Sequence, residues 1–399
     1  MTEHENINLF SIMNAFAEST GLTDPGRQPR RYLWTDAFAV CNFIEMYRQT
    51  DDRAYLQLAK QLVAQVHDVL GRTRDGSTLL SALNSHMDEN EAALHPTRGG
   101  LRIGKKLDER HEHEPFDDRL EWDRDGQYFH YLTKWMHALD CLARATGNGV
   151  YNRWAIELAQ TAFKAFSYTP DTAEARRMYW KMSIDLSRPL LYSMGQHDPL
   201  DGLLTFQQLQ ATAQLFPDTA DALTLQQEIS EFSAMCAGVD WATRDPLGIG
   251  GLLSDAYRLV QLIGEYGRPE ASRLESLLRD IEHSMQAFFS PEQHNSLALP
   301  AEYRLAFREL GLAIGLAAID RMQAATDRYP EKFTGSSRIS SSIHSLLRYR
   351  SVYHAIRDFW LVPEHHANEA WQEHRDINSV MLATCLAPDS YLTLSKSKY

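Results

Sequence analysis

The sequence predicts an all-α protein in which fully buried helices alternate with half-exposed ones. Apolar residues recur about every 3.6 residues along the whole chain, and period-2 alternation with β-branched residues is almost absent. Some helical segments carry a single apolar stripe, whereas others are apolar nearly all round. A helix of the second kind must be enclosed by other helices if the protein is water-soluble.

The half-exposed helices are predicted from their one-sided patterns. In the segment 52–70, Leu58, Leu62 and Val66 belong to one apolar stripe, and polar residues such as Arg53 and Lys60 surround the rest. The same pattern occurs in the segments 9–18, 152–166, 270–289 and 339–359. We expect about six such helices, each covering a buried one.

The enclosed helices are predicted where apolar residues fill all sides. These segments are 32–46, 128–145, 249–263, 305–322 and 377–386, with a less clear sixth at 179–194. Alternation of about six enclosed and six amphipathic helices favours a closed double ring, formed by residues 1–399 as a single domain. An open α-solenoid is the alternative, but its fixed repeat of roughly 34 to 47 residues is missing.

Charge and apolar run length exclude several classes of partner. The 399 residues include 40 Lys+Arg and 53 Asp+Glu, which gives a net charge of −13 and disfavours nucleic acid or an anionic membrane surface. The longest apolar stretch, 310–319, is about half of what a membrane span needs. The acidic start of the chain is unlike a signal peptide. We therefore expect a cytoplasmic protein that acts on a small molecule, and its oligomeric state stays open.

The four cysteines support this location. Cys41, Cys141, Cys236 and Cys385 are isolated in the sequence, with no Cys-x-x-Cys pair and no histidine at ligand spacing. We expect reduced, packed thiols.

Two similar segments suggest internal repetition. Asp198-Pro-Leu-Asp-Gly-Leu-Leu resembles the stretch that starts at Asp245-Pro-Leu-Gly. We interpret both as structural boundaries between helices, in which Pro and Gly end one helix and Asp caps the next.

Candidate functional residues are expected at the starts of the enclosed helices, because these starts would meet at one end of a ring. The first enclosed helix begins with an aromatic residue, Trp34, followed by a carboxylate, Asp36. Asp36 could equally be an acid favoured by the helix macrodipole.

The long connection 71–122 should fold over the mouth of the ring, since loops of this length are functional or disordered and its end is too apolar for disorder. It brings Glu121, Asp123 and Asp125 to the start of the second enclosed helix, beside Trp122 and Tyr128. Carboxylates against aromatic rings are typical of glycosidic chemistry, in which one acid protonates the leaving oxygen and a second stays ionised. Trp180 is a further ring that can stack on a sugar.

No metal or organic cofactor is expected. His111, His113 and several aspartates of the same loop could bind a metal, but Asp123-Arg-Asp-Gly lacks the remaining acids of a calcium loop. The His-Glu-His order also differs from the zinc-binding His-Glu-x-x-His helix. Glycine-rich dinucleotide and phosphate motifs, and the Gly-x-Ser-x-Gly elbow, do not occur in the sequence.

Other enclosed helices begin with further candidates. His197 and Asp198 precede one of them, Arg304 and Arg308 with Glu309 precede another, and His374-Arg375 stands near the head of the last. We expect Arg308 and Arg375 to hold substrate, with a structural ion pair as the alternative for Arg308-Glu309.

The alternation of helix types resembles that of the (α/α)6 toroid proteins, which include six-hairpin glycosidases and the N-acylglucosamine 2-epimerase type of sugar isomerase. The resemblance covers almost the whole chain as an architecture. It implies a carbohydrate-active enzyme, with glycoside hydrolysis by a pair drawn from Asp36, Glu121, Asp123 and Asp125 as the first hypothesis.

The placement of His374 and Arg375 is similar to that in the epimerase-type toroids. This likeness implies the second hypothesis, a sugar epimerase or isomerase in which His374 and either His197 or His130 transfer protons. A non-catalytic helical binding or scaffold protein is the third.

Overall fold

The computed structural model describes residues 7–24, 26–83, 89–171, 175–217, 223–290, 296–333 and 337–394. The chain divides into two compact units, which are described here one at a time. Of the described residues, those within Ala17–Gly238 form the N-terminal unit, and those within 7–16 and Val239–Leu394 form the C-terminal unit. Helix α1 (Leu9–Ser19) spans their boundary. The predicted single domain of residues 1–399 stays a prediction.

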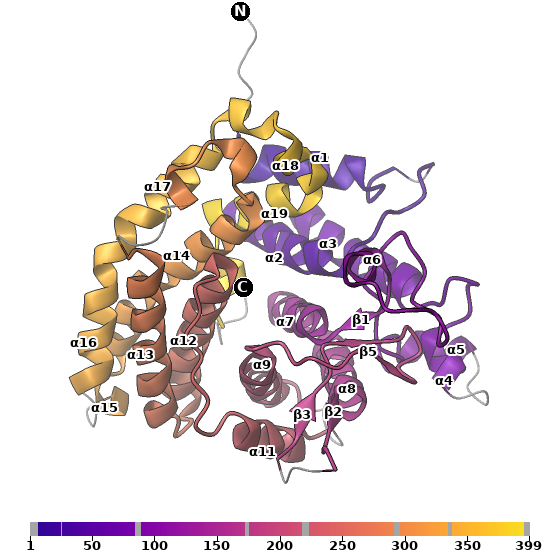
Figure 1. Cartoon of the computed structure of the whole chain (residues 1–399), viewed down its shortest axis with the longest axis horizontal. Helices are drawn as coiled ribbons and strands as arrows, with labels where there is room; N and C mark the ends of the chain where they lie inside the picture. Colours follow the sequence, from indigo (N-terminus) through magenta and orange to yellow (C-terminus); the bar gives the residue numbers. More distant parts are fainter. Residues whose placement is uncertain are drawn as a thin grey trace, which may run out of the picture. The chain divides into compact units, whose positions relative to one another are not determined.

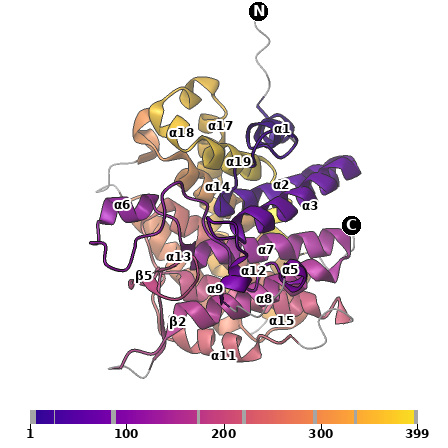
Figure 2. The same ribbon diagram turned by 90° about the vertical axis from the view of Figure 1, so that its right-hand side faces the viewer.

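The N-terminal unit is built on three helices that are buried over most of their length and pack in sequence order. They are α2 (Leu33–Thr50), α7 (Phe129–Thr146) and α9 (Asp198–Ala213). An outer helix covers each one: α3 (Arg53–Leu70) lies along α2, α8 (Gly149–Phe166) along α7, and α11 (Gln226–Met235) against α9 (Figures 1 and 2). The outer helices α3 and α8 bury one face each, as their stripes predict.

Helix ends in this unit follow local side-chain chemistry. Asp52 accepts a hydrogen bond from the backbone N–H of Ala54 at the start of α3. Asn148 does the same for Val150 at the start of α8. Gly147, with φ of 66°, ends α7 in the left-handed conformation that glycine adopts without strain.

Short elements connect these helices. The long connection contains α4 (Leu79–Leu83), α5 (Glu89–Leu94) and α6 (Asp118–Asp123). Strand β4 (Lys181–Met182) pairs antiparallel with both β1 (Gln127–Tyr128) and β5 (Pro189–Leu191). A second ribbon pairs β2 (Ser167–Tyr168) with β3 (Arg177–Met178).

The predicted enclosed helix at 179–194 is wrong, because this segment forms β4 and β5. The enclosed helix of this region is α9, which begins at Asp198. Pro199 in its first turn is compatible with a helix start, where the missing N–H is not needed. Gly202 lies inside the helix, where an added Cβ would be 2.7 Å from the ring of Phe232. Pro199 therefore belongs to a helix start, and Gly202 allows close packing inside the helix. The turn between helices that we expected at Asp198 is instead the first turn of a buried helix.

The C-terminal unit repeats the pattern of buried and covering helices. Its buried helices are α12 (Pro246–Tyr266), α14 (Ala306–Arg328) and α19 (Arg375–Leu386). The helices that cover them are α13 (Ala271–Phe288), α16 (Ser337–Leu346) and α17 (Arg350–Trp360). Shorter α-helices are α15 (Pro330–Phe333), α18 (Glu369–Glu373) and α20 (Asp389–Leu392). Single 3-10 turns occur at Ser296–Ala298, Ala301–Tyr303, Leu347–Tyr349 and Pro363–His366.

Helices α12 and α14 approach each other backbone to backbone. A Cβ added at Gly250 would lie 2.1 Å from the carbonyl oxygen of Gly311, and one at Gly315 would lie 2.5 Å from that of Gly250. Only glycine fits at such a crossing. This contact makes the two helices the centre of the C-terminal unit.

The predicted helix types agree with the structure outside α9. The segment 310–319 lies within the buried helix α14, and the predicted helix 339–359 is divided by a 3-10 turn into α16 and α17. Among the described residues, none of the helices has the length and apolar character that a membrane crossing requires.

Candidate active site

The buried helices of the N-terminal unit begin with residues that combine aromatic and titratable side chains. Trp34 is in the first turn of α2, His130 in that of α7, and Asp198 is the first residue of α9. The cap residues Tyr32 and Tyr128 give no side-chain hydrogen bond to the first turns of α2 and α7.

Five rings form what we call the aromatic cluster: Trp34, Tyr128, His130, Trp122 and Trp180. The His130 ring lies 6.0 Å from Trp34, 5.3 Å from Tyr128 and 6.3 Å from Trp180, measured between centroids. Trp122 continues the cluster at 5.1 Å from Trp180 and is 45% exposed. The structure thus brings together the four predicted aromatic residues, with His130 among them.

Three buried polar atoms at the starts of α7 and α9 have no hydrogen-bond partner. They are the hydroxyl of Tyr128, Nδ1 of His130 and Oδ2 of Asp198. Buried polar groups in proteins are nearly always paired, because an unpaired one costs about 1–3 kcal/mol. Two of these atoms belong to the aromatic cluster, and the third lies one helical turn from Asp201, whose charge acts on His130. We take these groups as the place where a polar ligand would complete the hydrogen bonding.

Asp198 and Asp201 form a pair of carboxylates one turn apart on α9, on the same side of the helix. Asp201 accepts hydrogen bonds from Lys134 Nζ at 3.0 Å to each oxygen and from the hydroxyl of Thr133. Both carboxylates are buried, but Asp198 leaves one oxygen unpaired. The two aspartates therefore have different environments.

These environments change the acidity of the groups. Burial, and then the negative charge of Asp201, raises the pKa of Asp198 to about 7. Burial, helped by the charge of Lys134, lowers the pKa of His130 to about 3. Burial also raises the pKa of Tyr128. Near neutral pH the site therefore holds a neutral imidazole, a protonated phenol and a carboxyl that can give up a proton.

Gly195 gives the Asp198 carboxyl its space. A Cβ at position 195 would lie 2.5 Å from Asp198 Oδ2, so any larger residue would displace the side chain. His197, which we named as a possible partner of His374 in proton transfer, directly precedes Asp198 as the N-terminal flanking residue of α9.

Asp36 is held by the segment before its own helix. One oxygen accepts the backbone N–H of Tyr32 at 2.9 Å, and the other lies 3.4 Å from Arg31, which is also buried. These contacts fix the entry of the chain into α2.

Glu121 is enclosed between two cations. Its carboxylate lies 2.8 Å from Lys181 Nζ and 3.0 Å from Arg110 Nε. Lys181 also donates to the backbone carbonyls of Glu121 and Arg124. The pair ties α6 to β4, with both side chains out of water.

Asp125 is fully buried, and both of its carboxylate oxygens have hydrogen-bond donors. It accepts hydrogen bonds from Arg102 at 2.8 Å and from the backbone N–H of Gly104 at 2.9 Å. Arg74 lies 3.4 Å away on the same oxygen as Arg102. Asp123, in contrast, is exposed at the end of α6. Asp36, Glu121 and Asp125 are the three buried acids predicted for catalysis. Each of them is bound by donors that belong to the N-terminal unit.

The remaining predicted residues belong to the C-terminal unit. Arg308 pairs with Asp245 at 2.6 Å, while Glu309 pairs with Arg304 in the buried interior. Structural ion pairs, the alternative for this charged stretch, are thus present, but Arg308 and Glu309 have different partners because neighbours on a helix point in different directions. His374 places its ring 5.5 Å from that of Phe307, and Arg375 is exposed as the first residue of α19.

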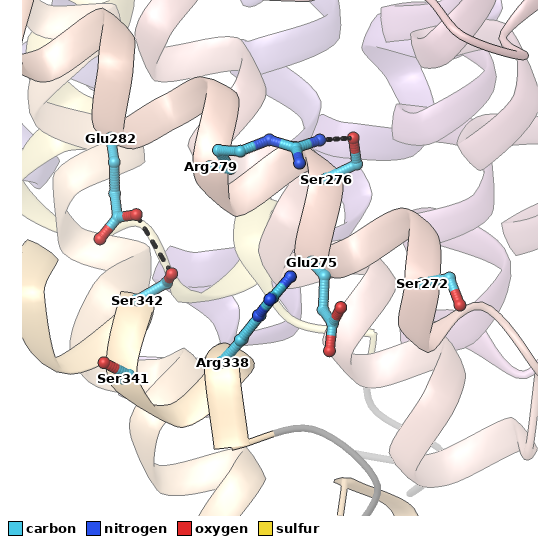
Figure 3. A pocket seen from close by; sticks show the side chains of 8 residues that line it. All are labelled: Ser272, Glu275, Ser276, Arg279, Glu282, Arg338, Ser341 and Ser342. Atoms are coloured by element: carbon cyan, nitrogen blue, oxygen red, sulfur yellow. Dashed lines mark hydrogen bonds between the residues drawn. The ribbon is translucent and has the colours of Figure 1, made fainter.

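A groove of about 520 Å³ lies elsewhere in the C-terminal unit, between α13 and α16 (Figure 3). Two of its charged side chains bond to serines that also line the groove. Arg279 donates to Ser276 at 2.6 Å, and Glu282 accepts from Ser342 at 3.2 Å. The groove has no aromatic lining residue. It lacks the unpaired buried groups found at α7 and α9 and is not our candidate site.

Sequence reasoning missed Lys134 and Asp201 and gave Asp198 only a minor place. The signal was present, since Asp-Pro-x-Asp puts two carboxylates one turn apart at the start of a helix. The partner Lys134 lies 67 residues earlier, so only the packing of α7 against α9 reveals it.

Comparison with solved structures gives the fold. An inactive variant of the α-1,6-mannanase GH76A of Salegentibacter sp. HEL1_6, in complex with α-1,6-mannotetrose, matches with a TM-score of 0.51 and 11% identity, over 96% of this chain and 99% of that chain. The same mannanase in another structure gives 0.50 and 12% over the same shares. A cellobiose 2-epimerase from Spirochaeta thermophila DSM 6192 gives 0.46 and 13%, over 96% and 98%.

The chain has the (α/α)6 toroid fold. The predicted fold class is thus confirmed. No protein-family model and no curated protein matches the sequence.

Proposed function

We propose that this toroid is a carbohydrate-active enzyme that hydrolyses a glycosidic bond, with Asp198 as the general acid. The observation that carries the proposal is the difference between two neighbouring carboxylates. Asp201 is paired with Lys134, whereas Asp198 is buried, lacks a partner on Oδ2 and has a pKa raised to about 7. Such a divided pair is what glycoside hydrolysis requires.

In the proposed reaction the Asp198 proton passes to the glycosidic oxygen as its bond to the anomeric carbon breaks. Positive charge develops on the sugar ring, and the nearby Asp201 carboxylate stabilises it electrostatically. Water adds to the anomeric carbon and returns a proton to Asp198. Lys134 and Thr133 hold Asp201 in place through its two oxygens.

The aromatic cluster supports a sugar as the ligand. Indole faces stack on the apolar C–H faces of sugar rings, and Trp34 and Trp180 are only half-buried. The unpaired Tyr128 hydroxyl and His130 Nδ1 supply one donor and one polar nitrogen beside them. Hydroxyl-rich ligands need this mixture of flat apolar surface and polar atoms.

The solved mannanase lends further support. Its inactive variants carry replacements of two neighbouring aspartates, and its complexes contain α-1,6-linked mannose oligomers. Paired acids in a related fold make a carboxylate mechanism the first to test here. We include α-1,6-mannotetraose among the trial substrates for that reason.

The buried carboxylates Asp36, Glu121 and Asp125 receive a positioning role in this proposal. Each is engaged by cations or backbone N–H groups that fix the first turn of α2 or the long connection. We also propose a cytoplasmic location, which is consistent with four buried, free cysteines.

The test measures turnover on a panel of α- and β-linked oligosaccharides by the release of reducing ends. We expect Asp198→Asn to lower kcat by roughly 10²- to 10⁴-fold, the usual contribution of a general acid. Asp389→Asn is the matched control, because Asp389 is also the first residue of a helix but pairs with Arg321 at the surface of the C-terminal unit. Full activity of Asp198→Asn on a confirmed substrate would show that Asp198 is not the general acid of this mechanism.

Proton transfer in a sugar epimerase or isomerase is the second candidate. The unpaired Nδ1 of His130 beside the aromatic rings favours it, since epimerisation needs a ring nitrogen that can face the carbon beside a sugar carbonyl. The same panel in D₂O separates the two reactions. Deuterium in recovered sugar, with no new reducing ends and with loss of exchange in His130→Gln, would establish epimerisation instead.

A further inference from the structure

A second cluster of chemically active groups lies deep in the N-terminal unit, where α2 packs against α7. It contains Cys41 from α2 and His137 with Cys141 from α7, and one ligand atom of each lies within 4.8 Å of the others. All three residues are at most 5% exposed. His137 and Cys141 are four residues apart, so they share one face of the helix.

This arrangement corrects the sequence analysis in one respect. The cysteines were interpreted as isolated, with no histidine at ligand spacing. Cys41 and Cys141 are isolated only along the chain, and His137 lies at the i,i+4 spacing that a helical metal site uses.

The histidine is oriented as in metal sites. Its Nε2 lies 3.5 Å from Cys141 Sγ, and its Nδ1 faces the side-chain amide of Gln208, at 3.2 Å from Oε1 and 3.0 Å from Nε2. That amide nitrogen also donates to Asp140 at 2.7 Å. Nδ1 can donate to Oε1 of Gln208, and in that tautomer the Nε2 lone pair faces Cys141 Sγ.

The outer part of this arrangement is itself anchored. Asp140 accepts hydrogen bonds from Arg144 at 2.9 Å and from Asn152 at 3.1 Å, in addition to Gln208. These three residues are buried and come from α7, α8 and α9. Outer partners of this kind fix the ring of a metal-binding histidine.

We propose that Cys41, His137 and Cys141 bind a soft metal ion, Cu⁺, in the interior of the N-terminal unit. Two thiolates and an imidazole suit both Cu⁺ and Zn²⁺. Structural zinc almost always takes four ligands, and among the described residues no fourth His, Cys, Asp or Glu joins this group. Three ligands in a closed interior therefore favour Cu⁺. The ion enters during folding, because the folded site is closed to solvent.

The experiment grows the full-length chain in medium containing copper and, separately, zinc, and measures metal per purified chain by mass spectrometry. We expect about one copper per chain and thiolate-to-copper charge-transfer absorption in the near ultraviolet. Less than about 0.1 copper per chain overturns the proposal. Retention of zinc in place of copper overturns the choice of ion and the coordination argument behind it.

Variants then test the residues. Cys41→Ser, Cys141→Ser and His137→Gln should each lower bound copper at least about tenfold. Cys385→Ser, a buried thiol of the C-terminal unit, should leave it unchanged. Equal copper in all variants overturns the assignment. Circular dichroism confirms which variants fold, and the wild-type measurement stands even if none does.

A disulfide between Cys41 and Cys141 is the alternative to a metal site, and counting free thiols distinguishes the two. Titration of the denatured wild-type chain should give four thiols once copper is removed by a chelator. Two thiols, restored to four only by a reductant, would indicate a Cys41–Cys141 disulfide and overturn the metal site.

Discussion

Lys134 Nζ lies 3.0 Å from both carboxylate oxygens of Asp201, and this contact joins the first part of α7 to the first turn of α9. The two side chains are mostly buried, at 14% and 8% exposure. The ion pair keeps a negative charge next to Asp198, whose Oδ2 has no hydrogen-bond partner. It therefore links the positioning of the helices to the acidity of the proposed catalytic acid.

Lys134→Met should lower the free energy of unfolding by roughly 3–5 kcal/mol, because it leaves the Asp201 carboxylate buried without its cation. It should also raise the pKa of Asp198, since the positive charge of Lys134 lowers it in the wild type. Urea unfolding measures the first effect and the alkaline limb of the rate–pH profile the second. Lys164→Met, at an exposed position of α8, is the control and should change neither.

The acidity of Asp198 gives a pH dependence of stability with a definite sign. Its folded pKa of about 7 lies above the ordinary value of 3.8, so the folded chain holds this proton more tightly than the unfolded chain. The resulting stabilisation is complete below about pH 4 and is lost as the pH rises through about 7. A shift of this size corresponds to a few kcal/mol at most.

Asp198→Asn should remove this pH dependence, because the amide does not titrate. Melting temperatures between about pH 5 and 8 provide the measurement. Asp389→Asn should keep the wild-type slope. An unchanged slope in Asp198→Asn would mean that another group loses the proton, and the raised pKa of Asp198 would no longer explain the profile.

Trp180→Ala should raise KM about tenfold or more while it changes kcat little, because stacking on a ring binds substrate and transition state alike. Trp180 lies within the aromatic cluster, 6.3 Å from His130. Trp360→Phe, a buried residue of the C-terminal unit, is a control for general loss of packing. A fall in kcat at constant KM would place Trp180 in the chemical step instead.

Periodicity made most of the fold predictable. The stripe of α3 and the all-round apolar character of α14 could be read from neighbouring residues, because helix burial depends on a local repeat. Helix α9 could not be recognised in the same way. Pro199 and Gly202 are residues of turns as well as of helix starts, and what distinguishes the two here is the contact of Gly202 with Phe232 in α11.

The candidate site was less predictable, because charges acquire their roles from distant partners. The acidic run that includes Glu121 and Asp125 was easy to notice. In the structure, however, Lys181 forms an ion pair with Glu121, and Arg102 forms one with Asp125. Lys181 is 60 residues from Glu121 in the sequence. Asp198 stands out for the opposite reason, since packing leaves one of its oxygens without a donor.

Glu121→Gln tests whether that carboxylate positions the loop. It leaves Lys181 buried with no counter-charge, so the free energy of unfolding should fall by roughly 3–5 kcal/mol. The double variant Glu121→Gln/Lys181→Met should recover part of this loss. Turnover of the folded fraction should stay within about threefold of wild type, as expected of a residue that acts through structure. A loss of kcat by two orders of magnitude at wild-type stability would return Glu121 to the catalytic candidates.

The last prediction concerns the contact of α12 with α14, where two adjacent glycines provide a matched comparison. Gly250→Ala places a methyl group 2.1 Å from the carbonyl oxygen of Gly311, so the helices must separate or the chain must lose several kcal/mol of stability. Gly251→Ala places the same methyl group in open space, with nothing within 4 Å. It should stabilise α12 by about 0.5–1 kcal/mol, because alanine restricts the unfolded backbone more than glycine does. Chemical denaturation of the two variants measures the difference. Equal effects at the two positions would contradict the backbone-to-backbone crossing on which the C-terminal unit is built.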